Sequence, residues 1–189
     1  MKKIIALVMC AVMLILSLSL SSCGKPNFVQ IEVKDYGTII VELYPDVAPI
    51  TVKNFKKLVS ENFYDGLIFH RVIEDFMIQG GGYTEDYQEK DCESIKGEFA
   101  SNGVENNLLH KRGVISMART NVKNSASSQF FIMHKDAPPL DGNYAAFGEV
   151  VSGIEVVDKI ATVDTNYNDM PYENIVIESI TFVDYKPEN

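Results

Sequence analysis

Basic charge is scarce in this chain of 189 residues. Lysine and arginine together number 17, against 26 aspartates and glutamates, which leaves a formal net charge of −9 at pH 7. Nucleic-acid binding needs basic patches that neutralise phosphates, so this balance argues against a nucleic-acid partner. The hydrophobic content of 46% is that of a globular protein, and the length suits one domain of ordinary size with an appendage.

Several catalytic templates are missing as well. The three histidines, His70, His110 and His134, are not spaced with one another or with cysteine as metal ligands are. No Gly-x-Ser-x-Gly motif offers a hydrolase nucleophile. The glycines at 80–82 follow an expected strand, but neither a lysine nor a helix follows them as in a phosphate-binding loop. We interpret His70, which lies in an apolar run, as a buried structural histidine. The sequence therefore predicts neither a metal nor a cofactor.

The first 22 residues have the pattern of a secretory signal. Lys2 and Lys3 make a basic start, and an apolar run from Ile4 to Leu16 follows them. The ending Leu-Ser-Ser-Cys at residues 20–23 resembles the bacterial lipobox, in which the cysteine is lipidated. We expect residues 1–22 to be a lipoprotein signal peptide and residues 23–27 to be a short tether that begins at a lipidated Cys23. The alternative is an ordinary cleaved signal that leaves Cys23 as a free thiol.

These expectations place the protein at a membrane and leave the processed chain with one unmodified cysteine. Acyl chains such as palmitate on Cys23 would anchor it to the outer face of the cytoplasmic membrane. Cys10 would leave with the signal, so Cys92 would remain alone and no intrachain disulfide would form. We interpret Cys92, in a polar and acidic stretch, as a thiol without function. Loss of Lys2 and Lys3 lowers the net charge from −9 to −11.

The rest of the chain is patterned as many short strands and two helices. The expected strands cover 28–33, 38–44, 67–73, 76–79, 114–118, 128–133, 144–150 and 175–185. One expected helix begins at Pro49, and a second covers 153–161. Residues 83–112 lack periodicity and are too long for an ordinary connection, so we expect a structured functional loop there. Because strands and helices do not alternate, the sequence predicts a mainly β domain over residues 28–186, built on an antiparallel sheet curled on itself.

The most unusual stretch is FHRVIEDFMIQGG at residues 69–81. It places Arg71 and Gln79, which carry many hydrogen-bond donors, in an otherwise apolar, strand-like run. Burying these donors without partners would be strongly unfavourable. Either the two side chains stabilise each other and the backbone, or they line a site where another molecule needs a donor.

Three segments together resemble the signature stretches of the cyclophilin-type peptidyl-prolyl isomerases. They are FHRVIEDFMIQGG, SMARTNVKNSASSQFFI and LDGNYAAFGEV, and the resemblance runs from about Val29 to Phe182. It implies a closed eight-stranded antiparallel β-barrel capped by two α-helices. It also implies an enzyme that accelerates X–Pro rotation in Pro-containing polypeptide clients, here exported proteins, and so assists their folding. The alternative is a non-catalytic surface chaperone or adaptor that binds Pro-containing segments.

The resemblance implies roles for individual residues. Arg71 takes the place of the catalytic arginine, and Gln79 that of the glutamine that orients it. Phe76, Met77, Phe131 and Leu140 match the floor and walls of the proline pocket. The remaining substrate-binding matches are Ala118, Arg119, Thr120, Gln129 and Tyr144.

This chain departs from the family pattern at three places. Pro139 stands where many members have a tryptophan that helps to bind cyclosporin, so cyclosporin binding is expected to be possible but weakened. Tyr144 stands where a histidine is common, and it can still pack on proline. Residues 85–93 replace a glycine-rich loop, so we expect contacts beyond the proline to differ.

Arginine in an apolar pocket suits this reaction chemically. The barrier to X–Pro rotation, about 18–20 kcal/mol, comes from amide resonance. At the twisted transition state the lone pair of the prolyl nitrogen is localised and can accept a hydrogen bond. A fixed Arg71 donor would bind the transition state and not the ground state, which is the requirement for raising a rate. An apolar pocket also favours the twisted amide, because it is less charge-separated than the planar one.

Overall fold

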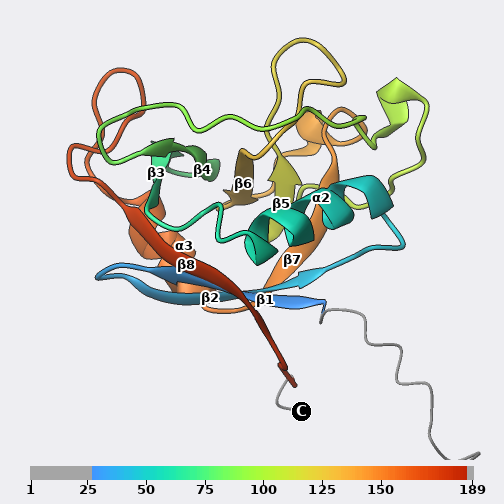
Figure 1. Cartoon of the computed structure of the whole chain (residues 1–189). Helices are drawn as coiled ribbons and strands as arrows, with labels where there is room; N and C mark the ends of the chain where they lie inside the picture. The colour runs from blue at the N-terminus through green and yellow to red at the C-terminus, as the bar shows by residue number, and fades with distance from the viewer. Residues whose placement is uncertain (1–26, 187–189) are drawn as a thin grey trace, which may run out of the picture.

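The computed structural model describes residues 27–186 (Figure 1). The predicted signal peptide, the lipidation of Cys23 and the tether before residue 27 lie outside the described residues. No helix within residues 27–186 is long and apolar enough to span a membrane.

Eight antiparallel strands close into a barrel, which confirms the predicted fold class. The strands are β1 (Phe28–Val33), β2 (Gly37–Leu43), β3 (Leu67–Ile73), β4 (Met77–Thr84), β5 (Val114–Met117), β6 (Phe130–Met133), β7 (Ala146–Ser152) and β8 (Val176–Val183). Their order around the barrel is β1-β2-β7-β5-β6-β4-β3-β8. Because the barrel within residues 27–186 is closed, each of its eight strands pairs with a neighbour on both sides.

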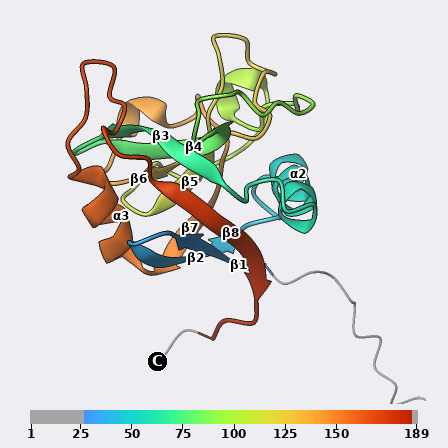
Figure 2. The ribbon, with the colours of Figure 1, turned by 60° about the vertical axis from the view of Figure 1, so that its left-hand side comes forward.

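Two helices complete the domain, α2 (Pro49–Ser60) and α3 (Ile154–Ala161), and the two views show them on opposite sides of the barrel (Figures 1 and 2). The first turn of α2 is capped from a distance by the buried carboxylate of Glu98. This carboxylate accepts hydrogen bonds from the backbone N–H groups of Ile50, at 3.0 Å, and Thr51, at 2.8 Å. A negative charge at a helix N-terminus is stabilising. Glu98 thus fastens the long 83–112 segment to the barrel.

Strand β6 is buried on both faces, which explains its continuous apolar sequence, Phe-Phe-Ile-Met. In β6, Phe130 and Ile132 belong to the large core cluster inside the barrel. The alternate residues Phe131 and Met133 belong to a second, smaller apolar cluster on the outer face. Because successive side chains of a strand point to opposite faces, the four residues of β6 contribute two side chains to each cluster. The outer cluster is the base of the site described below.

Element boundaries differ from the sequence expectations mainly around this outer cluster. The strand expected to stop at Gln79 continues as β4 to Thr84. Phe76 lies in the preceding turn, where its N–H donates to the Ile73 carbonyl at 3.1 Å, and Asp75 has a φ of 59°. Tyr144 and Gln129 also lie just outside β7 and β6. Several expected site residues therefore sit at strand ends and turns, where side chains are free to project.

Candidate active site

One pocket gathers nine of the eleven residues expected at the site. It is lined by Arg71, Phe76, Met77, Gln79, Ala118, Arg119, Phe131, Leu140 and Tyr144, and we call it the main pocket. Its volume of about 190 Å³ is below the roughly 300–1,000 Å³ of sites that enclose whole small molecules. The main pocket therefore suits one small side chain. Thr120 and Gln129 do not line it.

Arg71 stands at the edge of the main pocket on β3. The pairing of β3 with β4 shifts register between Phe69 and Arg71, as at a β-bulge, and such irregularities re-aim side chains next to functional sites. The Arg71 guanidinium pairs with Asp169, with Nε and Nη2 each 3.2 Å from Oδ2. Both side chains are about two-fifths exposed. The arginine is therefore oriented by a partner and still open to solvent.

Asp169 is a site residue that the sequence prediction missed. Its backbone is held in the left-handed region, with a φ of 62°, and its carbonyl accepts a 2.8 Å hydrogen bond from the N–H of Val72 in β3. The Asn166 side chain accepts hydrogen bonds from the N–H groups of Asn168 and Met170 and closes the loop. Asp169 is separated from Arg71 by 98 positions, and no local pattern links the two.

Gln79 makes a different contact from the one expected. Its Nε2 donates to Oε1 of Gln129 at 3.0 Å, while the described contacts of Arg71 run to Asp169. The expected hydrogen bond between Gln79 and the guanidinium is therefore replaced by an ion pair. In the pair with Asp169 both partners are charged, whereas in a bond to Gln79 only the guanidinium would be, so the carboxylate is the stronger acceptor. Gln129 is accommodated by Gly82, because a Cβ there would overlap its side chain.

The floor and far wall of the main pocket are aromatic. The rings of Phe131 and Tyr144 meet edge to face with centroids 5.9 Å apart, and His110 stacks behind Phe131 at 6.0 Å. Arg119 covers the other side of Tyr144, with its guanidinium carbon 4.5 Å from the ring centroid. Arg119 also donates from Nε and Nη2 to the Asn143 carbonyl, at 3.1 and 2.8 Å. The cation–π contact of Arg119 with the Tyr144 ring, and its hydrogen bonds to the preceding residue, thus fix the orientation of Tyr144 in the pocket wall.

Thr120 is turned away from the main pocket. Its N–H and hydroxyl both contact the Ser125 hydroxyl, at 2.9 and 2.8 Å, and its side chain stabilises the turn that follows. Its carbonyl accepts a hydrogen bond from Arg119 at 2.8 Å. Thr120 therefore shapes the rim through its turn.

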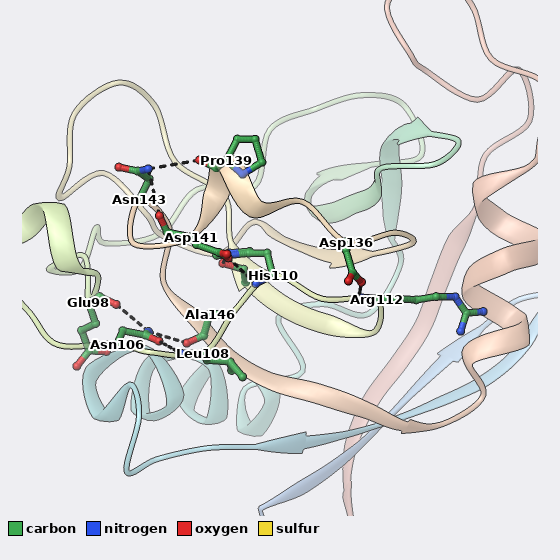
Figure 3. A network of polar contacts seen from close by, with 11 residues as sticks. Glu98, Asn106, Leu108, His110, Arg112, Asp136, Pro139, Asp141, Asn143 and Ala146 are labelled. Carbon is green, nitrogen blue, oxygen red and sulfur yellow. Dashed lines mark hydrogen bonds and ion pairs between the residues drawn. The ribbon is translucent and has the colours of Figure 1, made fainter.

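A buried polar network supports the far wall (Figure 3). The Asp141 carboxylate accepts a hydrogen bond from the backbone N–H of His110 at 2.7 Å and lies 3.1 Å from its Nδ1. His110 Nε2 lies 3.0 Å from the Ser116 hydroxyl, and the His110 carbonyl accepts from the Ala137 N–H at 2.8 Å. Asp141 directly follows Leu140, so the network fixes the short turn that carries Leu140 to the main pocket.

Ser116, His110 and Asp141 have the connectivity of a hydrolase triad but cannot act as one. In such a triad the serine must reach a substrate carbonyl. Here the Ser116 side chain is buried on the outer face of the barrel beneath the second apolar cluster, with 0% of its surface exposed. Burial also lowers the pKa of His110, although the Asp141 carboxylate opposes the shift. The three residues are therefore a structural network.

His70 is also kept neutral by its surroundings. Burial lowers its pKa to about 4, and the positive charge of Arg71 adds a smaller effect in the same direction. Its Nε2 lies 3.5 Å from Nε2 of Gln79, and its ring meets Tyr83 edge to face at 4.7 Å. A neutral imidazole beside Gln79 adds no second positive charge next to Arg71.

A pocket for one small side chain, with an apolar base and an arginine, Arg71, oriented at its edge, is the kind of site that a prolyl isomerase needs. Residues 28–182 match the family model for cyclophilin type peptidyl-prolyl cis-trans isomerase/CLD. A peptidyl-prolyl cis-trans isomerase of Acinetobacter baylyi is 46% identical over 162 residues, which cover 80% of this chain and 84% of that relative. Peptidyl-prolyl cis-trans isomerase B of Escherichia coli is 43% identical over 160 residues, covering 78% of this chain and 94% of the relative.

Solved structures agree with the sequence relatives. A cyclophilin-type isomerase of Cryptosporidium parvum, crystallised in the presence of the dipeptide Ala-Pro, superposes with a TM-score of 0.71 at 28% identity, covering 84% of this chain and 99% of that chain. The chain belongs to the cyclophilin-type peptidyl-prolyl cis-trans isomerase family. Its activity is the acceleration of X–Pro bond rotation.

Proposed function

We propose that Arg71 is the catalytic donor of this isomerase and that Asp169 orients it. An arginine carries five N–H donors in a planar fork. The Nε and Nη2 groups face Asp169, and among the contacts of residues 27–186 the Nη1 group has no partner. Nη1 is therefore free to donate to the prolyl nitrogen when the amide twists. This placement of Arg71 at the edge of the main pocket is the observation that carries the proposal.

The main pocket holds the prolyl ring in this proposal. Met77 and Phe131 are 2% and 5% exposed and form its apolar base, with Phe76, Leu140 and Tyr144 around the rim. Seated there, the ring is fixed while the carbonyl on the other side of the amide turns. Ala118, Arg119 and Thr120 lie beside the main pocket in a segment that can pair with the client backbone. Gln129 acts through Gln79, to which it is hydrogen-bonded.

The clients are exported proteins, and the enzyme meets them at the outer face of the cytoplasmic membrane. The signal-like residues 1–22 and the lipobox-like ending at Cys23 support this assignment. Three residues lie between Cys23 and Asn27, and the four residue-to-residue steps span at most about 14 Å. An anchored enzyme would therefore work directly at the membrane surface, where exported chains emerge and fold.

Isomerisation and binding are separated by one experiment on the full chain. Exchange between the cis and trans forms of a prolyl peptide is measured by NMR, with and without the enzyme, for the parent and for Arg71→Lys. We expect catalysis by the parent and a large loss in Arg71→Lys, because an ammonium lacks the planar fork that Asp169 orients. A parent that binds the peptide without accelerating exchange would instead act as a Pro-binding adaptor.

The lipid anchor has a matched control in the chain itself. In cells fed a labelled fatty acid, the parent and Cys92→Ala are expected to incorporate label, and Cys23→Ala is expected to lose it. Release of an unlabelled parent into the medium would show an ordinary cleaved signal.

A further inference from the structure

A second pocket adjoins the main pocket and has no role in the mechanism above. It is lined by His70, Gln79, Tyr83, Tyr87, Gln129 and Met170, and we call it the flanking pocket. Gln79 lines both pockets, so the two are neighbours on the surface. The flanking pocket has a volume of about 430 Å³, more than twice the roughly 190 Å³ of the main pocket. It has room for a larger side chain than proline.

Two loops add residues to the flanking pocket, and one of them, at residues 85–93, is where this chain departs from the family pattern. Tyr87 comes from the stretch at residues 85–93, and Met170 follows Asp169 in the loop that holds Arg71. Tyr87 is 38% exposed and has a φ of 58°, in the left-handed region that a bulky residue rarely adopts. Such conformations persist only where the surrounding structure imposes them, and they gather at binding sites.

Hydrogen bonds hold the turn that presents Tyr87. Its N–H donates to the Thr84 carbonyl at 2.9 Å, and the N–H of Thr84 donates to the Gln88 carbonyl at 3.0 Å. The N–H of Gln88 in turn donates to the Thr84 hydroxyl at 3.1 Å. Tyr83, which also lines the flanking pocket, is fixed by its edge-to-face contact with His70. Both tyrosines are thus set in place before a ligand arrives, which lowers the entropic cost of binding.

The lining favours a large apolar or aromatic side chain. Two tyrosines and a methionine offer flat and adaptable apolar surfaces, and aromatic pairs gain from edge-to-face contacts. The Gln79 and Gln129 carboxamides are joined by one hydrogen bond, from Nε2 of Gln79 to Oε1 of Gln129. Glu85, Asp86 and Glu89 are exposed in the loop that carries Tyr87, and they disfavour an acidic client residue.

We propose that the flanking pocket is a second client subsite, which takes a large apolar or aromatic side chain within three positions of the proline. An extended client advances about 3.3–3.6 Å per residue, so a residue near the seated proline can reach a pocket that shares Gln79. The enzyme would then prefer prolines close to aromatic residues, which are exposed in unfolded chains and buried in folded ones. This proposal rests on the client-binding role given above to the main pocket.

The test uses prolyl peptides with alanine at every flanking position or with a single phenylalanine at each of the three positions on either side. For the full chain, we expect phenylalanine at one position to raise kcat/KM about tenfold over the all-alanine peptide, because an aromatic ring leaves water. Aspartate at that position gives no gain. Tyr87→Ser and Met170→Ser reduce the ratio towards one, and Tyr87→Phe retains it.

Tyr172→Ser is the matched control. Tyr172 is 74% exposed and lines a different depression with Pro171 and Glu173, so its loss leaves the phenylalanine preference unchanged. Equal rates for all peptides with the parent, or a preference that survives in both Tyr87→Ser and Met170→Ser, would overturn the proposal. Activity on the all-alanine peptide reports on the main pocket separately, so the two roles fail independently.

Discussion

The two walls of the main pocket are stabilised in opposite ways. On the β3 wall, Arg71 is oriented by Asp169 through an ion pair whose side chains are 41% and 40% exposed. On the far wall, Phe131 and Leu140 are backed by His110, whose side chain is wholly buried. Exposed ion pairs are weak and screened by salt, whereas a buried hydrogen-bonded group is costly to disrupt. The proposed catalytic donor thus lies on the wall held by a weak, exposed ion pair. The wall that shapes the pocket is held by buried contacts.

The largest expected effect comes from removing the donor itself. Arg71→Ala should lower kcat/KM by about 10²–10³-fold, the usual loss for one preorganised donor at a transition state. Because Arg71 is two-fifths exposed, the melting temperature should hardly change. Isomerisation rates and a thermal melt of the same sample check both statements. A large loss of stability with retained activity would reverse the assignment of the two walls.

His110→Ala should affect the far wall in the opposite sense. It removes the imidazole between Asp141 and the buried Ser116 hydroxyl, leaves that hydroxyl without this partner and opens a cavity behind Phe131, while the backbone N–H of residue 110 can still donate to Asp141. We expect the free energy of unfolding to fall by about 3 kcal/mol. Urea denaturation measures this loss. His134→Ala, which changes a histidine in contact with the exposed Asp75 and Asp158, serves as the control and should cost clearly less.

Acid should destabilise the β3 wall through His70. Its pKa of about 4 in the folded protein lies below the value of about 6.5 in the unfolded chain, so the unfolded state binds the proton first. The contribution is complete above about pH 6.5 and is lost as the pH falls towards 4. Between pH 7.5 and 5 we expect a loss of about 2 kcal/mol.

Urea denaturation at the two pH values, for the parent and for His70→Gln, isolates this contribution. The variant should lose less stability than the parent over the same interval. His110 has a lowered pKa too, but the Asp141 carboxylate opposes the shift. An equal loss in both proteins would assign the pH dependence to other groups.

The smallest expected effect is on the orientation of Arg71. Asp169→Asn keeps the shape of the side chain and removes its charge, and we expect kcat/KM to fall about fivefold, as for an exposed pair worth about 1 kcal/mol. Asp169→Glu should restore part of the loss. Raising the salt concentration should slow the parent more than Asp169→Asn, because only the parent has an ion pair to screen. Identical salt responses would exclude an orienting role for Asp169.

The sequence predicts the local structure of this domain well. The strands expected at 28–33, 67–73 and 114–118 are found within a residue, and the helices expected at Pro49 and at 153–161 are present. The signature segments also contain the nine residues that line the main pocket. These successes share one cause, since strand and helix periods are written in neighbouring residues.

Apart from element boundaries, the expectations that differ from the structure concern the partners of side chains. Gln79 was expected to hold Arg71 and contacts Gln129 instead, while Thr120 supports a turn. Asp169 carries no local signal, because its acidic side chain is one among 26 acidic residues. The role of Asp141 was equally hidden, since it rests on a contact with His110, 31 positions earlier.

The strands, the apolar lining and the arginine within FHRVIEDFMIQGG can be predicted from neighbouring residues, because strand patterns and side-chain types are local properties of the chain. How that arginine is held depends on the closed barrel, which brings Asp169 to Arg71 across 98 positions. The same closure sets Tyr87 and Met170 around the flanking pocket and leaves Gln79 between the two pockets. The sequence specifies which side chains are present, whereas the tertiary structure determines which of them are in contact.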